Sequence, residues 1–201
     1  MRLNPRKLRS SSRDNSECKG TLTGTYFITI CTKDCGSLFG DVVDGEMRLN
    51  EFGKVVRDEW LRMADIRSNL KLDDFVVMPN HLHGIVVVDI DGSGEAQSAL
   101  DNEFGLSDEV DYDSIGRVIG QFKSIVTRRI NTIQKRRGSA VWQRSCHKHN
   151  VCDEKELYAI REYIVGNPAR WTWDAQNPQS SLGQQGSPSE YDLSWEQESH
   201  S

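Results

Sequence analysis

The chain has 201 residues and a formal net charge of −5, and 36% of its residues are hydrophobic and 27% charged. This length suits one domain with a full hydrophobic core. We expect no membrane-spanning helix, because no apolar run reaches the roughly eighteen residues that such a helix needs. The five cysteines are odd in number and form no C-x-x-C pair, which favours reduced thiols and a cytoplasmic protein.

Strand and helix patterns alternate irregularly along the chain. Runs rich in β-branched and aromatic residues predict strands at 24–32, 41–49 (a hairpin around Asp44-Gly45), 71–79 and 81–90. Apolar residues at helical spacing predict helices at 51–66, 114–133 and 154–167, with Asn50 and Asp153 as N-caps. This order predicts an α+β domain with a central, mainly antiparallel sheet packed against helices.

The predicted folded domain covers residues 24–173, with an arm before it, a tail after it and an insertion within it. The arm 1–23 is basic and rich in serine, and the tail 174–201 is acidic and rich in glutamine and serine, so we expect both to be disordered. The stretch 89–113 is an acidic insertion before the second predicted helix. It could be a lid, a partner-binding segment or a tolerated loop.

The negative charge is concentrated in two of these segments. Residues 89–113 hold nine acidic residues and 174–201 hold five, and neither contains Lys or Arg. In the rest of the chain 25 basic residues face 16 acidic ones, a balance that suits binding of a polyanion. The densest basic run, 115–137, has seven basic residues and no acidic one. It indicates either a phosphate-binding surface or a solvated helix face.

Two histidines interrupt the apolar run "FVVMPNHLHGIVVV". Side chains at positions i and i+2 of a strand share one face, so His81 and His83 point together while Leu82 points into the core. Two adjacent imidazoles form part of a metal site. The alternative is a pair of hydrogen-bonded histidines on a sheet surface, since H-x-H is a short pattern.

The last predicted helix places a phenol and an amide on one face, because Tyr163 and Asn167 are four residues apart. A tyrosine hydroxyl beside a metal ion could attack a phosphodiester. A core tyrosine with its hydroxyl at the surface is the alternative. Tyr158 is a rival nucleophile, but it lies roughly 140 degrees around the helix from Tyr163, so only one of the two can face a metal.

The chain resembles the single-tyrosine HUH-type transposases, in particular the branch associated with repetitive extragenic palindromes (REP-associated tyrosine transposases). The resemblance spans residues 24–173, in the segments "YFITICT", "LFGDVVDGEMRLNEFGKVVRDEW", "LDDFVVMPNHLHGIVVV", "IGRVIGQFKSIVTRRIN", "VWQRSCHKH" and "REYIVGNPARW". HUH denotes histidine, hydrophobic residue, histidine, which here is His81-Leu82-His83. The resemblance implies a ferredoxin-like palm, an antiparallel sheet with packed helices.

This resemblance also implies an activity and a site. His81, His83 and Asn167 would bind Mg or Mn, and Tyr163 would be the nucleophile. The enzyme would cleave and rejoin single-stranded DNA beside hairpins through a 5′-phosphotyrosine intermediate, as in DNA transposition, near the bacterial nucleoid. The alternative is a domesticated protein that binds DNA hairpins without cleaving them. Relatives include monomers and dimers, so a homodimer stays open.

Further residues are candidates for DNA contacts. The candidates for phosphate contacts are Arg117, Lys123, Arg128 and Arg129. The candidates for contacts with an unpaired base are Trp142, Gln143 and Arg144, although a buried Trp142 is the alternative. His149 matches a family histidine that supports the site, but Lys148 stands where many relatives have an acid. A zinc site of Cys146, His147, His149 and Cys152 is a weaker alternative, because the spacing matches no standard zinc motif.

Overall fold

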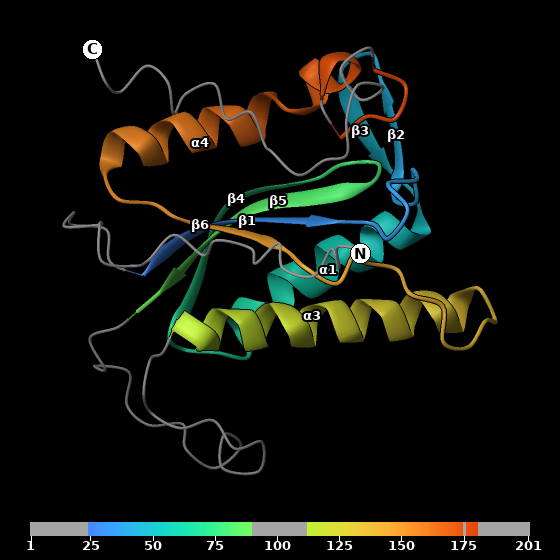
Figure 1. The fold of residues 1–201 in the computed structure, drawn as a ribbon, viewed down its shortest axis with the longest axis horizontal. Coiled ribbons are helices and arrows are strands. Elements are labelled where there is room, and N and C mark those ends of the chain that lie inside the picture. The colour runs from blue at the N-terminus through green and yellow to red at the C-terminus, as the bar shows by residue number, and fades with distance from the viewer. Residues whose placement is uncertain (1–23, 90–111, 175, 181–201) are drawn as a thin grey trace, which may run out of the picture.

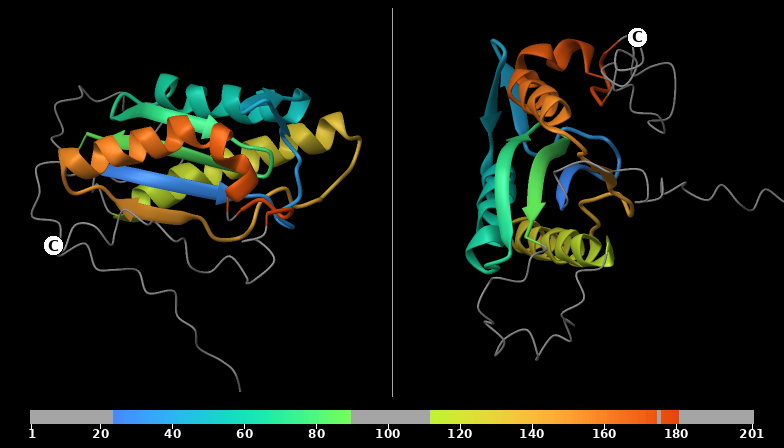
Figure 2. Two further views of the ribbon diagram at one scale, coloured as in Figure 1. Left: turned by 90° about the horizontal axis from the view of Figure 1, so that it is seen from above. Right: turned by 90° about the vertical axis from the view of Figure 1, so that its left-hand side faces the viewer.

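A four-stranded sheet lies at the centre of the molecule, with helix α4 against one face and helices α1 and α3 against the other (Figures 1 and 2). The computed structural model describes residues 24–89, 112–174 and 176–180. The predicted arm 1–23, residues 90–111 of the predicted insertion, and most of the predicted tail lie outside these residues.

The described elements are listed here in chain order. The strands are β1 (Thr25–Cys31), β2 (Gly40–Val43), β3 (Glu46–Leu49), β4 (Leu70–Val77), β5 (His81–Val88) and β6 (His147–Asn150). The helices are α1 (Glu51–Asp65), α3 (Tyr112–Ile133), α4 (Glu154–Gly166) and the short 3₁₀ helix η1 (Pro168–Trp173).

Every neighbouring pair in the central sheet is antiparallel, in the order β4-β5-β1-β6, and β2 and β3 form a separate hairpin. The predicted α+β fold is therefore confirmed. The sequence did not predict β6, because its four residues "HKHN" are polar and half-buried and lack an alternating pattern. This strand is defined by its pairing with β1.

Local signals in the sequence set several element boundaries. The Asn50 side chain accepts hydrogen bonds from the backbone N–H groups of Phe52 and Gly53 and so caps α1, and Asp153 caps α4 in the same way. Asp44 and Gly45 have φ angles of 54° and 78°, the left-handed conformation that a two-residue hairpin turn requires. Both predicted caps and the predicted hairpin are confirmed.

The alternation of β1 and β5 divides the apolar residues into two clusters. One face of the sheet packs on α1 and α3 through residues such as Ile28 and Leu82, and the other packs on α4 through Phe27 and Ile85. Gly84 belongs to the first face, where an added Cβ would lie 2.4 Å from the Trp60 ring. The histidines of β5 therefore face α4, since they alternate with Leu82 and Gly84.

The cysteines only partly fit the prediction of reduced thiols. Cys31, Cys35 and Cys146 are free, whereas Cys152 is disulfide-bonded. Spacing alone could not show this, because a disulfide joins residues that the fold brings together. No helix within the described ranges has the length and apolar character needed to cross a membrane.

Candidate metal centre and tyrosine

His81 and His83 lie side by side on β5 with ring centroids 4.5 Å apart, and both are fully buried. The Thr29 hydroxyl of β1 lies 2.8 Å from His83 Nδ1, and the Asn80 side-chain oxygen lies 2.8 Å from His81 Nδ1. Because Asn80 Oδ1 can only accept, His81 Nδ1 donates and its Nε2 keeps a lone pair. The strand and its neighbours thus orient both imidazoles, and Nε2 of His81 is available to a ligand.

Burial keeps both imidazoles neutral. It lowers the pKa of His81 to about 4, although the Asp174 carboxylate and the Asn167 side chain act in the opposite direction. Burial also lowers the pKa of His83 well below its usual value, and the neighbouring His81 and His147 lower it further. A neutral imidazole is the form that binds a metal ion.

Asp174 completes a group of metal-ligating side chains with the two histidines. One ligand atom of each of these residues lies within 4.8 Å of the others, and no other such group of three or more His, Cys, Asp or Glu residues occurs in the described part of the chain. Asp174 directly follows η1, and its Oδ2 accepts a hydrogen bond of 3.1 Å from Asn167 Nδ2. The sequence prediction placed Asp174 at the start of a disordered tail and so missed it.

The polar atoms around this group suit a divalent cation. His81 Nε2 and Asn167 Oδ1 are buried and have no hydrogen-bond partner. Buried polar atoms are normally paired, and two unpaired acceptors beside a carboxylate form a donor set that a cation would satisfy. Imidazole nitrogens together with carboxylate and amide oxygens fit a divalent metal ion. The structure therefore brings four polar side chains close together, those of His81, His83, Asp174 and the predicted Asn167.

Tyr163 reaches the same point from α4. Its hydroxyl lies 3.3 Å from His83 Nε2, and its ring packs edge-on against Phe27. Burial and the Asp174 carboxylate raise the pKa of Tyr163 above its usual value, and the Asn167 amide and Arg170 offset part of this rise. The phenol is therefore protonated at neutral pH.

The rival tyrosine lies elsewhere on α4. Tyr158 is 64% exposed, whereas Tyr163 is half-buried against the histidines. The helical spacing predicted that only one of the two could face the metal site. The structure places Tyr163 there.

Two further contacts fix α4 on the sheet. Arg161 pairs with Asp73 of β4 through both carboxylate oxygens. Glu156 in the first turn of α4 accepts a hydrogen bond of 2.7 Å from His149 Nε2 on β6. His149, the predicted supporting histidine, thus contacts the tyrosine helix, while His147 lies opposite Thr29 and closer to His83.

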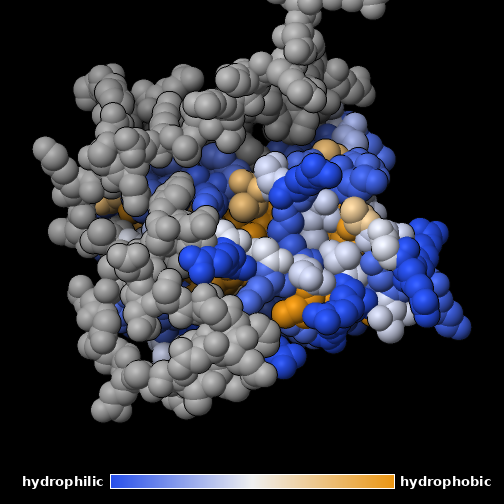
Figure 3. Space-filling view, turned by 60° about the horizontal axis from the view of Figure 1, so that its bottom comes forward, coloured by the Kyte–Doolittle hydropathy of each residue, from blue (hydrophilic) through white to orange (hydrophobic). Residues whose placement is uncertain are grey.

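A basic groove of about 660 Å³ lies between α3 and the segment that follows it. Figure 3 shows that hydrophilic residues predominate on the visible part of the face that carries α3. The charged residues lining the groove are Lys123, Arg128, Arg136, Arg137 and Arg144. Sequence analysis named three of these, and it missed Arg136 and Arg137, which belong to the same basic run but follow the helix.

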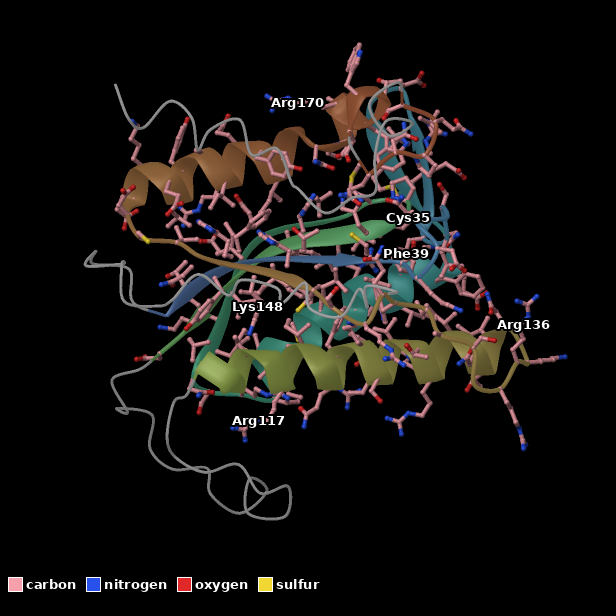
Figure 4. The ribbon with its side chains drawn as sticks, viewed as in Figure 1. Cys35, Phe39, Arg117, Arg136, Lys148 and Arg170 are labelled. Carbon is pink, nitrogen blue, oxygen red and sulfur yellow. The ribbon has the colours of Figure 1, made fainter. Side chains whose placement is uncertain are left out.

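The remaining predicted DNA contacts differ in their surroundings. Lys123 Nζ donates to the backbone carbonyls of residues 143, 144 and 145, and Arg129 pairs with the buried Glu59. Trp142 is buried against Phe39, as the alternative expected. Arg117 points away from the sheet, below α3 in Figure 4.

Hydrogen bonds connect the lining of the groove to the residues around His81. Gln143, which lines the groove, donates its backbone N–H to the carbonyl of Cys31, and Cys31 pairs with His81 across the sheet. The Gln143 side-chain amide also donates to Cys35 Sγ at 3.4 Å. The backbone carbonyl of Cys35 in turn accepts a hydrogen bond from the Asn80 side chain. One short loop therefore contacts both the groove and the residue that orients His81.

The chain is similar to solved structures and to a curated protein. No family model matches the chain. One solved structure, a REP-associated tyrosine transposase bound to a REP hairpin, is 16% identical with a TM-score of 0.47, covering 77% of this chain and 72% of that one. A candidate transposase from Deinococcus radiodurans R1 is 19% identical with a TM-score of 0.35, covering 70% of this chain and 88% of that one.

A curated relative, an uncharacterised protein of Haemophilus influenzae, is 36% identical over 155 residues, which cover 75% of this chain and 83% of that protein. The chain belongs to the same family as this Haemophilus protein.

Proposed function

We propose that the chain is a metal-dependent enzyme that cleaves and rejoins single-stranded DNA beside hairpins, as in DNA transposition. The observation that carries this proposal is the position of the Tyr163 hydroxyl, 3.3 Å from His83 Nε2 and next to His81 and Asp174. A nucleophile beside a cluster of metal ligands is the arrangement that phosphoryl transfer to a side chain requires.

The reaction follows from the chemistry of a phenol. The Tyr163 oxygen attacks the phosphorus of a phosphodiester, the bond from phosphorus to the 3′ oxygen breaks, and that oxygen leaves with a proton as a 3′-hydroxyl. The 5′ end stays on Tyr163 as a phosphotyrosine ester. A 3′-hydroxyl from the same or another strand can attack this ester and release Tyr163, so the phosphodiester is restored without ATP.

A divalent ion supplies positive charge to the phosphate oxygens and lowers the pKa of the phenol when it is bound. His81, His83 and Asp174 would hold it, with Asn167 Oδ1 as a further oxygen donor. Asn167 also keeps Asp174 in place through its amide N–H. Asn167 would therefore be both a metal ligand, as predicted, and a residue that positions Asp174.

The basic groove is the proposed path of the DNA backbone toward this site. Arg128, Arg136, Arg137 and Arg144 would contact phosphates, since their positions along α3 and the following segment trace one continuous groove. Lys123 and Arg129 are committed to contacts within the protein, so we assign them to its structure instead. Hydrogen bonds through the end of β1 and the loop after it connect the lining of the groove to Asn80, which orients His81.

The test is formation of a covalent adduct. Purified protein is incubated with labelled single-stranded oligonucleotides that carry a hairpin, with Mn²⁺, Mg²⁺ or EDTA, and resolved on a denaturing gel. We expect a metal-dependent adduct from the wild type and from Tyr158→Phe, and none from Tyr163→Phe or His81→Ala. Tyr158→Phe is the matched control, because it removes an exposed hydroxyl from the same helix.

Other outcomes separate the alternatives. Salt-sensitive hairpin binding with no adduct from any hairpin, under any metal, would favour the non-catalytic hairpin-binding protein. An adduct that survives Tyr163→Phe but not Tyr158→Phe would transfer the role of nucleophile to Tyr158. An adduct that forms equally in EDTA would remove the metal from the mechanism.

A further inference from the structure

The short helix η1 presents two different sides because of its 3₁₀ geometry. Residues three apart in a 3₁₀ helix lie above one another. Trp171 and Asp174 share the side that faces the metal centre: the Trp171 ring lies 6.0 Å from that of His81, and Asp174 belongs to the group of metal-ligating side chains. Arg170 and Trp173 are also three residues apart, so they share a second side of η1, adjacent to the first.

This second side is open to solvent. Trp173 is 68% exposed, the most exposed tryptophan of the described residues. Arg170 is exposed as well and lies beside η1 above the end of α4 in Figure 4. The exposed indole offers a flat aromatic face on which an unpaired base can stack.

Arg170 also lies close to the nucleophile. Its guanidinium carbon is 3.6 Å from the position that a Cβ on Gly166 would occupy, so it rests over the end of α4, one turn beyond Tyr163. Its positive charge is among the influences that lower the pKa of Tyr163. The Arg170 cation therefore lies near the proposed nucleophile, and Trp173 follows it three residues later on η1.

We propose that Arg170 and Trp173 form a nucleotide-binding platform for the single strand next to the cleaved phosphate. An unpaired base would stack on the Trp173 ring while Arg170 contacts its phosphate, the combination by which proteins hold single strands. The assignment rests on the proposed function and adds to it. The active site would then bind an unpaired nucleotide directly, in addition to the contacts made by the basic groove.

The experiment measures binding without cleavage. Fluorescence anisotropy in EDTA gives the Kd of the full chain for a labelled single-stranded oligonucleotide with a hairpin, at several salt concentrations. We expect Trp173→Ala to weaken binding about tenfold or more, and Trp173→Phe to restore most of it, because a phenyl ring still stacks. Tyr158→Ala, which removes another exposed aromatic ring from the same layer, should leave the Kd unchanged.

Two further measurements identify the contacts. Arg170→Ala should flatten the slope of log K against log salt by about 0.7, the value for one phosphate contact on a single strand. Oligonucleotides with one abasic position each should reveal a base whose removal weakens binding to the wild type but not to Trp173→Ala. This loss of additivity is the signature of a base stacked on that ring.

The outcomes distinguish this platform from the proposed function. If Trp173→Ala binds as tightly as the wild type while adducts still depend on Tyr163 and metal, the platform is refuted and the function stands. If Trp173→Ala changes the oligomeric state in sedimentation but not the Kd, Trp173 serves a protein contact and the platform is refuted. If the wild type binds no single strand and forms no adduct, both proposals fall.

Discussion

Asn80 is expected to orient the metal centre, and its replacement tests this directly. The residue is 1% exposed, its Oδ1 accepts from His81 Nδ1, and its Nδ2 donates to the carbonyls of Cys35 and Gln176 at 2.7 and 2.6 Å. Three hydrogen bonds at about 0.5–1.5 kcal/mol each predict that Asn80→Ala lowers the free energy of unfolding by about 2–4 kcal/mol. Loss of a group that orients a ligating histidine predicts about 10- to 100-fold weaker metal binding.

The two effects can be separated with Asn80→Asp. An aspartate keeps an acceptor for His81 Nδ1 but has no donor for the carbonyls of Cys35 and Gln176, so stability should fall while metal binding is retained. Urea unfolding gives the stability, and titration of Mn²⁺ followed by electron paramagnetic resonance gives the affinity. If Asn80→Ala binds Mn²⁺ as tightly as the wild type, Asn80 does not orient His81 for a metal.

Three further predictions follow from other contacts. Gly84→Ala should destabilise the chain by about 1–3 kcal/mol in urea unfolding, because its Cβ would overlap the Trp60 ring, and unchanged stability would contradict this. Asp73→Asn should cost below about 1 kcal/mol at neutral pH because its partner is exposed. Arg161 holds the pKa of Asp73 below 3.8, so the difference in stability between Asp73→Asn and the wild type should vanish as the pH falls below about 4. A mixture of His81→Ala and Tyr163→Phe should form no adduct on a denaturing gel, because each chain would build its own site; a restored adduct would show that two chains share it.

Much of the candidate site is visible in the sequence because its key spacings are local. The period of a strand places His81 and His83 on one face, and the period of a helix places Tyr163 and Asn167 together. Both patterns hold in the structure. What the periods do not give is the distance between strand and helix, which depends on how α4 packs on the sheet.

Asp174 was missed for a physical reason. Its approach to His81 depends on the course of the chain through η1, which begins at Pro168 just after α4. The sequence there has no helical or strand period, and the polar residues that follow resemble a disordered tail. In the structure Gln176 and Ser180 are buried, and the backbone of Gln176 contacts Asn80.

The basic residues show a different limit of the sequence. Arg128 and Arg129 are adjacent in one charge run, yet the first lines the groove and the second pairs with Glu59. A helix turns about 100 degrees per residue, so neighbours meet different partners. Residue type and local density predicted a basic surface, but only the packing of α1 against α3 decides which side chains remain available to a phosphate.

Helix α4, which carries Tyr163, contacts the sheet at several points along its length. Glu156 contacts β6 near the start of α4, Arg161 contacts β4 in its middle, and Tyr163 follows two residues later against β5. A helix that moved to a second chain would leave these contacts and the apolar cluster around Ile160, and it would need the same partners on that chain. In this structure Tyr163 lies beside His83 of the same chain.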